Sequence, residues 1–340
     1  MPLKPRPSYP QGEIKTYSFE SHLLKKNFLR DPHVRDLRLY YPSDYDKNHH
    51  YPLLVDLAPY TNSGQGRCQW KAFGESVPDR LDRLIATGVL PACIVAFPDT
   101  MTRYGGNQFV NSSVMGPWED HFHQELIPFI EETASCGGEG LRACYGKSSG
   151  GYGALYFAFK RPGFWSAVAC QSGDIAFDIT YLPGFPDALT QLSRFGGSIE
   201  AFLKDFEETD KPGSPQLMTL MLVLGMGASY DPDPASSCGV RLPVDPDTCE
   251  LIPDRWKKWQ AFDPLALFES YGENLRLLKG LFIDCGNRDQ FQHHYGARRL
   301  AKKLREKKIP HLYEEFEGTH FDIDHRLDQS LPFLVNSLLR

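Results

Sequence analysis

The sequence lacks any long apolar run. No stretch approaches the roughly 18 consecutive apolar residues that a membrane-spanning helix requires. The N-terminal region contains Lys4 and Arg6 but no apolar stretch after them, so it does not have the pattern of a secretory signal. We therefore expect a cytoplasmic protein that does not associate with a membrane.

An excess of basic residues is also missing. The chain has 37 Lys and Arg against 43 Asp and Glu, which gives a net charge of −6. Such a chain has no general attraction for phosphate backbones or anionic lipids, so we expect no nucleic-acid partner. The basic stretch at 297–308 is expected to be the solvated face of a helix that turns Leu300 and Leu304 inward. The sequence leaves the oligomeric state open.

Paired cysteines and clusters of metal ligands are absent as well. The eight cysteines include no Cys-x-x-Cys pair, and several lie in apolar runs, which predicts buried free thiols. Cys238 and Cys249 flank a loop and could form a disulfide in an oxidising compartment. His121 and His123 are two residues apart in a predicted helix and therefore point to different faces. The sequence thus predicts no metal site and no cofactor.

The chain does contain short apolar runs that alternate with helical patterns. Runs without polar alternation are typical of strands that are covered on both faces. This alternation predicts an α/β fold with a mostly parallel central sheet and helices on both faces. The predicted strands are 51–57, 92–97, 141–145, 166–170, 281–284 and 310–316, and the predicted helices are 80–88, 118–132, 153–161 and 295–308.

Two segments depart from this alternation. Residues 1–15 carry four prolines and are expected to form an N-terminal arm, followed by a single domain at 16–340 whose first strands are antiparallel. Residues 174–262 are rich in Pro, Gly and Asp, and we expect an insertion over one end of the sheet. Its aromatic residues could line a pocket or form the insertion's own core: Phe177, Tyr181, Phe185, Trp256 and Trp259.

Residues 146–150 read Gly-Lys-Ser-Ser-Gly, between a predicted buried strand and a helix rich in small residues. This context is that of a nucleophile elbow, in which a serine with a strained backbone projects above the sheet. The residues two before and two after that serine approach so closely that a Cβ would clash. Only Ser148 has glycine at both positions and is the predicted nucleophile. Ser149 is expected to offer its backbone N–H at the N-terminus of the following helix. A phosphate-binding P-loop would require glycine where Leu141 stands.

A nucleophilic serine needs a histidine base and an acid that orients the histidine. In an architecture built around such an elbow, both follow the serine along the chain. Asp289 comes just after the predicted strand 281–284 and is the expected acid, although it could instead cap a helix. Asp284, inside that strand, is the alternative.

The base should follow the last predicted strand. His320 lies in the loop after it and is the expected base, with His325 as the competitor. His293 and His294 open a helix near Asp289 and could line the site, although structural roles are favoured.

A second oxyanion donor should come from the loop after the strand at 51–57. Pro59 has no N–H, so Tyr60 is the expected donor, with Ala58 and Thr61 as alternatives.

These residues together resemble the putative-esterase branch of the α/β-hydrolases, which includes enterochelin esterases, feruloyl esterases, S-formylglutathione hydrolase and the mycolyltransferases. The resemblance covers about residues 17–338 and is carried by YPSDYDKNHHYPLLVDLAPY, GGNQFVNSSVMGPWEDHFHQELIPFIEE, GKSSGGYGAL, LFIDCGNRDQF and EGTHFDIDHR. It implies an α/β-hydrolase fold, with the insertion at the active-site end. On the family's pattern, the triad would be Ser148, Asp289 and His320, and the oxyanion donors Tyr60 and Ser149.

The chain departs from the family pattern at one point. Many relatives have a glycine before the first oxyanion donor, where this chain has Ala58-Pro59, so the identity of that donor stays open. The segment 104–111 resembles the family's loop near the pocket, and a purely structural loop is the alternative.

The triad and the resemblance predict a serine carboxylesterase that hydrolyses a small-molecule ester through an acyl-enzyme. Acyl transfer or thioester hydrolysis on the same triad is an alternative, as is a non-catalytic binding protein that kept the fold. The sequence does not name the ester.

Overall fold

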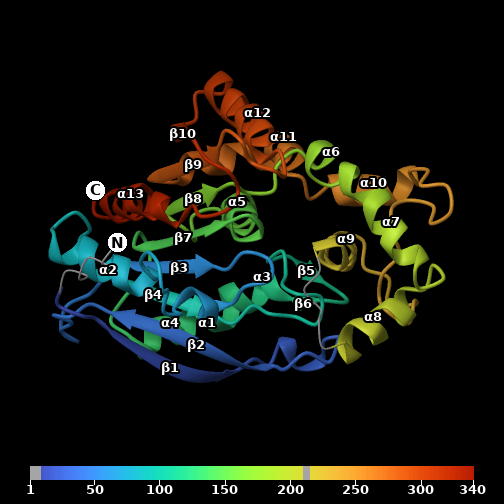
Figure 1. Ribbon diagram of the computed structural model, residues 1–340. Coiled ribbons are helices and arrows are strands. Elements are labelled where there is room, and N and C mark those ends of the chain that lie inside the picture. The colour runs from blue at the N-terminus through green and yellow to red at the C-terminus, as the bar shows by residue number, and fades with distance from the viewer. Residues whose placement is uncertain (1–8, 210–214) are drawn as a thin grey trace, which may run out of the picture.

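The computed structural model describes residues 9–209 and 215–340 of the chain (Figure 1). Its centre is an eight-stranded sheet with the strand order β1-β2-β4-β3-β7-β8-β9-β10. Strand β2 is antiparallel to both β1 and β4, and all other neighbours are parallel, which confirms the predicted mostly parallel sheet. The strands are β1 (Glu13–Glu20), β2 (Val34–Tyr41), β3 (Leu53–Leu57), β4 (Ile94–Pro98), β7 (Arg142–Lys147), β8 (Ala167–Gln171), β9 (Gly280–Gly286) and β10 (Leu312–Phe316).

Helices cover both faces of the sheet, as the unbroken apolar runs predict. All five residues of β3 are buried, but Leu54 packs in the core beside α2 and α13, whereas Val55 packs in the core beside α5. The helices that flank the sheet are α2 (Val77–Ala86), α3 (Trp118–Asp120) with a π-helical turn (His121–Leu126) and α4 (Ile127–Thr133), α5 (Ser149–Lys160), α11 (Pro264–Tyr271), α12 (His293–Glu306) and α13 (Leu327–Leu338).

Shorter elements complete the connections between the strands. They are the single-turn helices η1 (Leu24–Lys26), α1 (Gly64–Arg67) and η5 (Asp324–Arg326), the longer η4 (Gly272–Leu277), and a small hairpin of β5 (Asn111–Ser112) and β6 (Gly116–Pro117).

The arm predicted at 1–15 is shorter than expected. Strand β1 begins at Glu13, so residues 13–15 belong to the edge of the sheet, where Glu13 pairs with Tyr41 and Lys15 with Leu39. The proline content that suggested an arm ends at Pro10, and pairing with β2 extends the strand beyond the alternating pattern that was visible in the sequence. Residues 1–8 of the predicted arm lie outside the described part of the chain.

The described residues of the stretch 174–262, namely 174–209 and 215–262, form mostly helices beyond the carboxyl ends of the parallel strands (Figure 1). We call these residues the cap segment; its status as an insertion within one domain stays a prediction. The apolar residues 217–224, near the middle of the cap segment, are part of the long helix α9. The helices are α6 (Phe177–Thr180), η3 (Leu182–Gly184), α7 (Phe185–Ser193), α8 (Ile199–Glu208), α9 (Pro215–Tyr230) and α10 (Pro253–Gln260).

Aromatic residues of the cap segment pack against one another within the core on one face of the sheet. The ring of Phe185 contacts those of Trp256 and Trp259 at centroid distances of 6.0 and 5.5 Å. Tyr181 differs because it also lines the pocket that contains Ser148.

All eight cysteines are free thiols, so Cys238 and Cys249 are not bridged. Within residues 9–209 and 215–340, no helix has the length and apolar character needed to cross a membrane.

Candidate active site

Ser148 occupies the sharp turn between β7 and α5. Its backbone adopts φ 56° and ψ −124°, a strained conformation for a residue with a side chain. A Cβ on Gly150 would lie 1.8 Å from the carbonyl oxygen of Leu57, and one on Gly146 would lie 2.5 Å from the same atom. The turn therefore requires glycine at the two positions that the sequence pattern singled out, and it leaves Ser148 half-buried at the pocket.

His320 and Asp289 are brought together from two loops at the carboxyl ends of β9 and β10. The Nδ1 atom of His320 lies 2.8 Å from Oδ2 of Asp289, and both side chains are buried. The other carboxylate oxygen, Oδ1, accepts a hydrogen bond of 2.8 Å from the N–H of Phe291. Asp289 thus orients the histidine and supports the turn before α12 at the same time.

The pKa of Asp289 shows that its carboxylate is held in the ionised form. Burial would raise this pKa, but the hydrogen bond from His320 leads the effects that outweigh burial, and the pKa is lowered to about 2. An ionised carboxylate at Nδ1 of His320 leaves Nε2 as the nitrogen that can accept a proton.

The two alternative triad residues lie elsewhere. Asp284 is buried inside β9, where it accepts a hydrogen bond of 2.9 Å from Nε of Arg326. His325 is exposed, and its Nδ1 lies 3.2 Å from the carbonyl oxygen of Asp322. Neither lines the pocket that contains Ser148.

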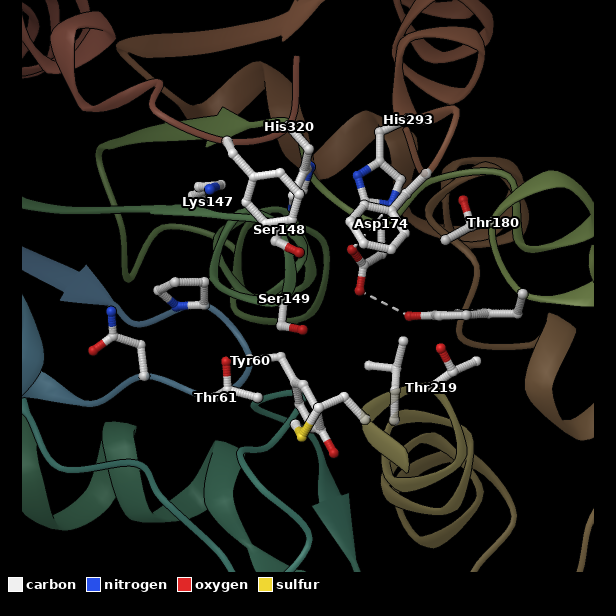
Figure 2. Close-up of a pocket in the computed structure, with 17 residues that line it drawn as sticks. Tyr60, Thr61, Lys147, Ser148, Ser149, Asp174, Thr180, Thr219, His293 and His320 are labelled. Atoms are coloured by element: carbon white, nitrogen blue, oxygen red, sulfur yellow. Dashed lines mark hydrogen bonds and ion pairs between the residues drawn. The ribbon is translucent and has the colours of Figure 1, made fainter. Parts of the chain in front are cut away.

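Ser148 and His320 line the same pocket, which has a volume of about 580 Å³ (Figure 2). Within the described residues, the side chains of Ser148 and His320 are not hydrogen bonded to each other. The Ser148 hydroxyl instead faces Asp174. Contacts of this kind are often long before a substrate is bound. The pocket is lined by Pro59, Tyr60, Thr61, Asn62, Lys147, Ser148, Ser149, Asp174, Thr180, Tyr181, Met218, Thr219, Leu222, Phe291, His293, His320 and Phe321.

Two backbone N–H groups are available beside Ser148. Ser149 is the first residue of α5, so its N–H has no carbonyl one turn earlier and lies at the positive end of the helix dipole. Among the described residues, no backbone carbonyl accepts from the Tyr60 N–H. The Thr61 N–H, by contrast, donates to the carbonyl of Gly105 at 2.7 Å. The geometry therefore favours Tyr60 over Thr61 as the first donor.

The segment 104–111 lies against both of these donors. Gly105 and Gly106 have positive φ angles, and a Cβ on either would lie 3.0 Å from the Tyr60 side chain. The Tyr60 hydroxyl donates to the carbonyl of Tyr104. Further along, Nε2 of Gln108 donates to Oγ of Ser149 at 2.6 Å. The segment thus packs on Tyr60 and binds Ser149.

A ring of buried polar side chains continues from Ser149 into the cap segment. Gln108 accepts from the Tyr230 hydroxyl at 3.1 Å, and the hydroxyls of Tyr230 and Tyr181 are 3.4 Å apart. Tyr181 donates to Oδ2 of Asp174 at 2.8 Å, and the Ser149 hydroxyl faces the Asp174 carboxylate, which completes the ring. We call this the Ser149 ring.

Asp174 is a pocket residue that the sequence did not predict. His293 also lines the pocket, which was the less favoured of the two roles expected for it. Nε2 of His293 lies 3.5 Å from Oδ1 of Asp174, and its Nδ1 lies 3.7 Å from Oδ2 of Asp289. One signal was present: Asp174 follows the carboxyl end of β8, the position at which α/β sheets place functional side chains.

One cluster in the described residues has the composition of a metal site. Asp289, His293 and His320 bring ligand-type atoms within 4.8 Å of one another. Because Asp289 and His320 already hydrogen bond to each other, the cluster belongs to the candidate triad.

Comparison with known families gives an independent result. The profile of the family described as "Putative esterase" matches residues 32–328, which is most of the chain. The chain belongs to this family. Family membership and fold together identify a carboxylic ester hydrolase with an α/β-hydrolase-type fold.

Solved structures of esterases share the fold of this family member. A ferulic acid esterase is similar with a TM-score of 0.61 and 18% identity, covering 97% of this chain and 100% of its own. The ferulic acid esterase from Anaeromyces mucronatus has a TM-score of 0.54 and 15% identity, with coverages of 99% and 95%. S-formylglutathione hydrolase from Staphylococcus aureus has a TM-score of 0.55 and 10% identity, with coverages of 97% and 100%. A search of curated protein sequences found no match.

Proposed function

We propose that the chain is a serine esterase that hydrolyses its substrate through an acyl-enzyme on Ser148. One observation carries this proposal: the hydrogen-bonded pair of His320 and Asp289 opens into the same pocket as a serine held in an elbow at a helix N-terminus. A strained serine, an oriented histidine and free N–H donors are the groups that acyl transfer requires.

The first half of the reaction forms the acyl-enzyme. Nε2 of His320 takes the hydroxyl proton of Ser148 as Oγ attacks the ester carbonyl, and Asp289 stabilises the imidazolium. The N–H groups of Ser149 and Tyr60 donate to the oxyanion, and removal of one such donor typically costs about 3 kcal/mol. Collapse of the tetrahedral intermediate breaks the bond to the alcohol, which leaves with the proton that His320 held.

The second half repeats these steps with water. His320 takes a proton from water, the resulting hydroxide attacks the acyl carbonyl, and the proton returns to Oγ of Ser148 as the acid departs. An alcohol in place of water would give acyl transfer by the same steps. The nucleophile, the base, the orienting acid and the oxyanion donors of this scheme are all groups of the chain itself.

Turnover of p-nitrophenyl butyrate together with labelling by a fluorophosphonate tests this proposal. We expect the wild type to hydrolyse the ester and to carry the label on Ser148, and Ser148→Ala to lose both. Ser149→Ala keeps the Ser149 N–H and is expected to retain the label on Ser148. A wild type that neither turns over the ester nor takes the label would refute the proposal.

A further inference from the structure

Asp174 is a buried carboxyl without a cationic partner. Its exposed fraction is 4%, and its carboxylate accepts a hydrogen bond from the Tyr181 hydroxyl. Among residues 9–209 and 215–340, no Lys or Arg forms an ion pair with it. Buried carboxylates are normally paired with a cation because an unpaired charge in a low-dielectric site is costly.

His293 does not supply the missing charge. Burial lowers the pKa of its imidazole to about 3, so the ring is neutral at physiological pH. Burial also raises the pKa of Asp174, and the hydrogen bond from Tyr181 only partly opposes this effect, so that pKa lies at about 7. The free pocket therefore contains a carboxyl that would ionise readily if a cation were bound beside it.

Asp174 lies where the acyl part of an ester would be bound. The hydroxyls of Ser148 and Ser149 both face its carboxylate (Figure 2). The leaving alcohol must meet His320, which donates its proton, so the acyl chain extends to the other side of Ser148. Asp174 lies on that side with Tyr181, whose hydroxyl donates to it, and Met218 and Leu222 of the cap segment also line the pocket.

The basic residue of the pocket lies away from this wall. Figure 2 shows Lys147 and Asp174 on opposite sides of Ser148, and the Lys147 ammonium lies 5.3 Å from the ring centroid of Phe321. Lys147 therefore does not neutralise Asp174, and the acyl side of the pocket offers an acidic group surrounded by apolar and hydroxyl groups.

We propose that Asp174 binds an ammonium group on the acyl chain, one or two carbons from the ester carbonyl, so that the substrates are short aminoacyl esters. This proposal rests on the serine esterase function proposed above. The distance follows from the chemistry: the attacked carbonyl carbon bonds to Oγ of Ser148, which faces Asp174, so only a group close to the carbonyl can reach the carboxylate. A longer acyl chain would carry its amine past Asp174 toward Tyr181.

A pair of isosteric esters tests the proposal. The acyl chain of p-nitrophenyl β-alanate ends in an ammonium group, whereas that of p-nitrophenyl butyrate ends in a methyl group of similar size. The readout is the ratio of their kcat/KM values, divided by the ratio of their hydroxide-catalysed rates, which removes the difference in intrinsic reactivity. At about pH 8 we expect a wild-type ratio of at least about 10, because close charge pairs in desolvated sites couple strongly.

Two variants show whether a preference comes from Asp174. Asp174→Asn is expected to bring the ratio to about 1, and a general loss of activity cancels in the ratio. Asp178→Asn removes a carboxylate of α6 that pairs with Arg299 outside the pocket, and it should leave the ratio unchanged. A wild-type ratio of 1 or less, or a ratio that Asp174→Asn leaves unchanged, overturns the proposal.

The wild type alone provides a further readout if Asp174→Asn does not fold. The titratable groups around Asp174 are His293 and Tyr181 and, further away, Asp289, Tyr230, Tyr152 and Cys170. Asp174 has a pKa of about 7, whereas the pKa values of Asp289 and His293 are far lower and that of Tyr181 is far higher. Asp174 therefore ionises between about pH 6 and about pH 8, where the β-alanyl amine stays protonated. The ratio should rise about tenfold over this range. A ratio that does not change with pH also overturns the proposal.

Failure of the underlying esterase function gives a different result. If butyrate is hydrolysed and the fluorophosphonate labels Ser148 without any preference for β-alanate, only the aminoacyl proposal is overturned. If neither ester is turned over and Ser148 is not labelled, both proposals are overturned.

Discussion

Nδ1 of His320 lies 2.8 Å from Oδ2 of Asp289, although the two residues are 31 positions apart in the sequence. The two loops meet because β9 and β10 are adjacent and parallel, so their carboxyl ends lie at the same edge of the sheet. The pair is therefore fixed by the sheet rather than by local contacts.

Replacement of Asp289 by asparagine should abolish most activity without unfolding the protein. The amide would favour the wrong tautomer of His320, and we expect kcat for p-nitrophenyl butyrate to fall by about 10⁴. Asp284→Asn is the matched control: it removes a buried carboxylate that binds Arg326, so it should lower stability but change kcat by less than about tenfold. Equal losses of kcat in the two variants would contradict the assignment of Asp289.

Gly150→Ala should damage both stability and activity. The new Cβ would lie 1.8 Å from the carbonyl oxygen of Leu57, so β3 and α5 would have to separate. We expect a loss of about 3 kcal/mol in the free energy of unfolding and a large loss of kcat, measured by urea denaturation and ester turnover. At Gly184 no atom lies within 4 Å of an added Cβ, and Gly184→Ala should stay within about 0.5 kcal/mol of the wild type. Similar stabilities of the two variants would contradict the close contact.

Gly105→Ala tests the support of Tyr60. Gly105 has φ 81°, and an added Cβ would lie 3.0 Å from the Tyr60 hydroxyl. Gly163 has a similar φ of 77°, but no atom lies within 4 Å of its Cβ position. Both alanine variants should lose about 1 kcal/mol from backbone strain. Only Gly105→Ala should also lower kcat, by at least about tenfold, because it displaces an oxyanion donor. An unchanged kcat in Gly105→Ala would indicate that Tyr60 is not that donor.

Asp174 should make the stability of the wild type depend on pH. Its pKa is about 7 in the folded protein and about 3.9 in the unfolded chain. Between these values the folded protein retains a proton that the unfolded chain has lost, so this group's contribution to stability falls as pH rises. Asn cannot ionise. The free energy of unfolding of Asp174→Asn, minus that of the wild type, should therefore increase from about pH 4 to about pH 7, by at most about 1.4 kcal/mol per pH unit.

Urea denaturation of both proteins across this range measures the difference. The comparison at each pH cancels the titration of other groups that the two proteins share. A difference that stays constant with pH would show that Asp174 is ionised throughout.

Much of the site could be predicted from the sequence because its signals are local. The glycines on both sides of Ser148 and the strand before it lie within ten residues, so backbone sterics alone distinguished Ser148 from Ser149. Asp289 and His320 could be chosen because each follows a strand that belongs to the parallel sheet, and parallel strands end at one edge.

The rest depends on contacts that no local pattern encodes. Asp174 reaches Ser148 only because the chain turns back after β8, and His293 joins it only because α12 packs nearby. Similarly, the Thr61 N–H cannot serve an oxyanion because it donates to the carbonyl of Gly105, which lies more than forty residues further along the chain. The start of β1 depends on pairing with β2, which extended the strand to Glu13.

The Ser149 ring joins three parts of the chain: the elbow, the segment 104–111 and the cap segment. Because Tyr181 and Tyr230 of the cap segment bind the same network as Ser149, the wall of the acyl pocket cannot swing away without breaking buried hydrogen bonds. The conformational entropy of this wall is therefore lost during folding and not during binding. A substrate meets a rigid acyl pocket, and discrimination between acyl groups is set before the ester arrives.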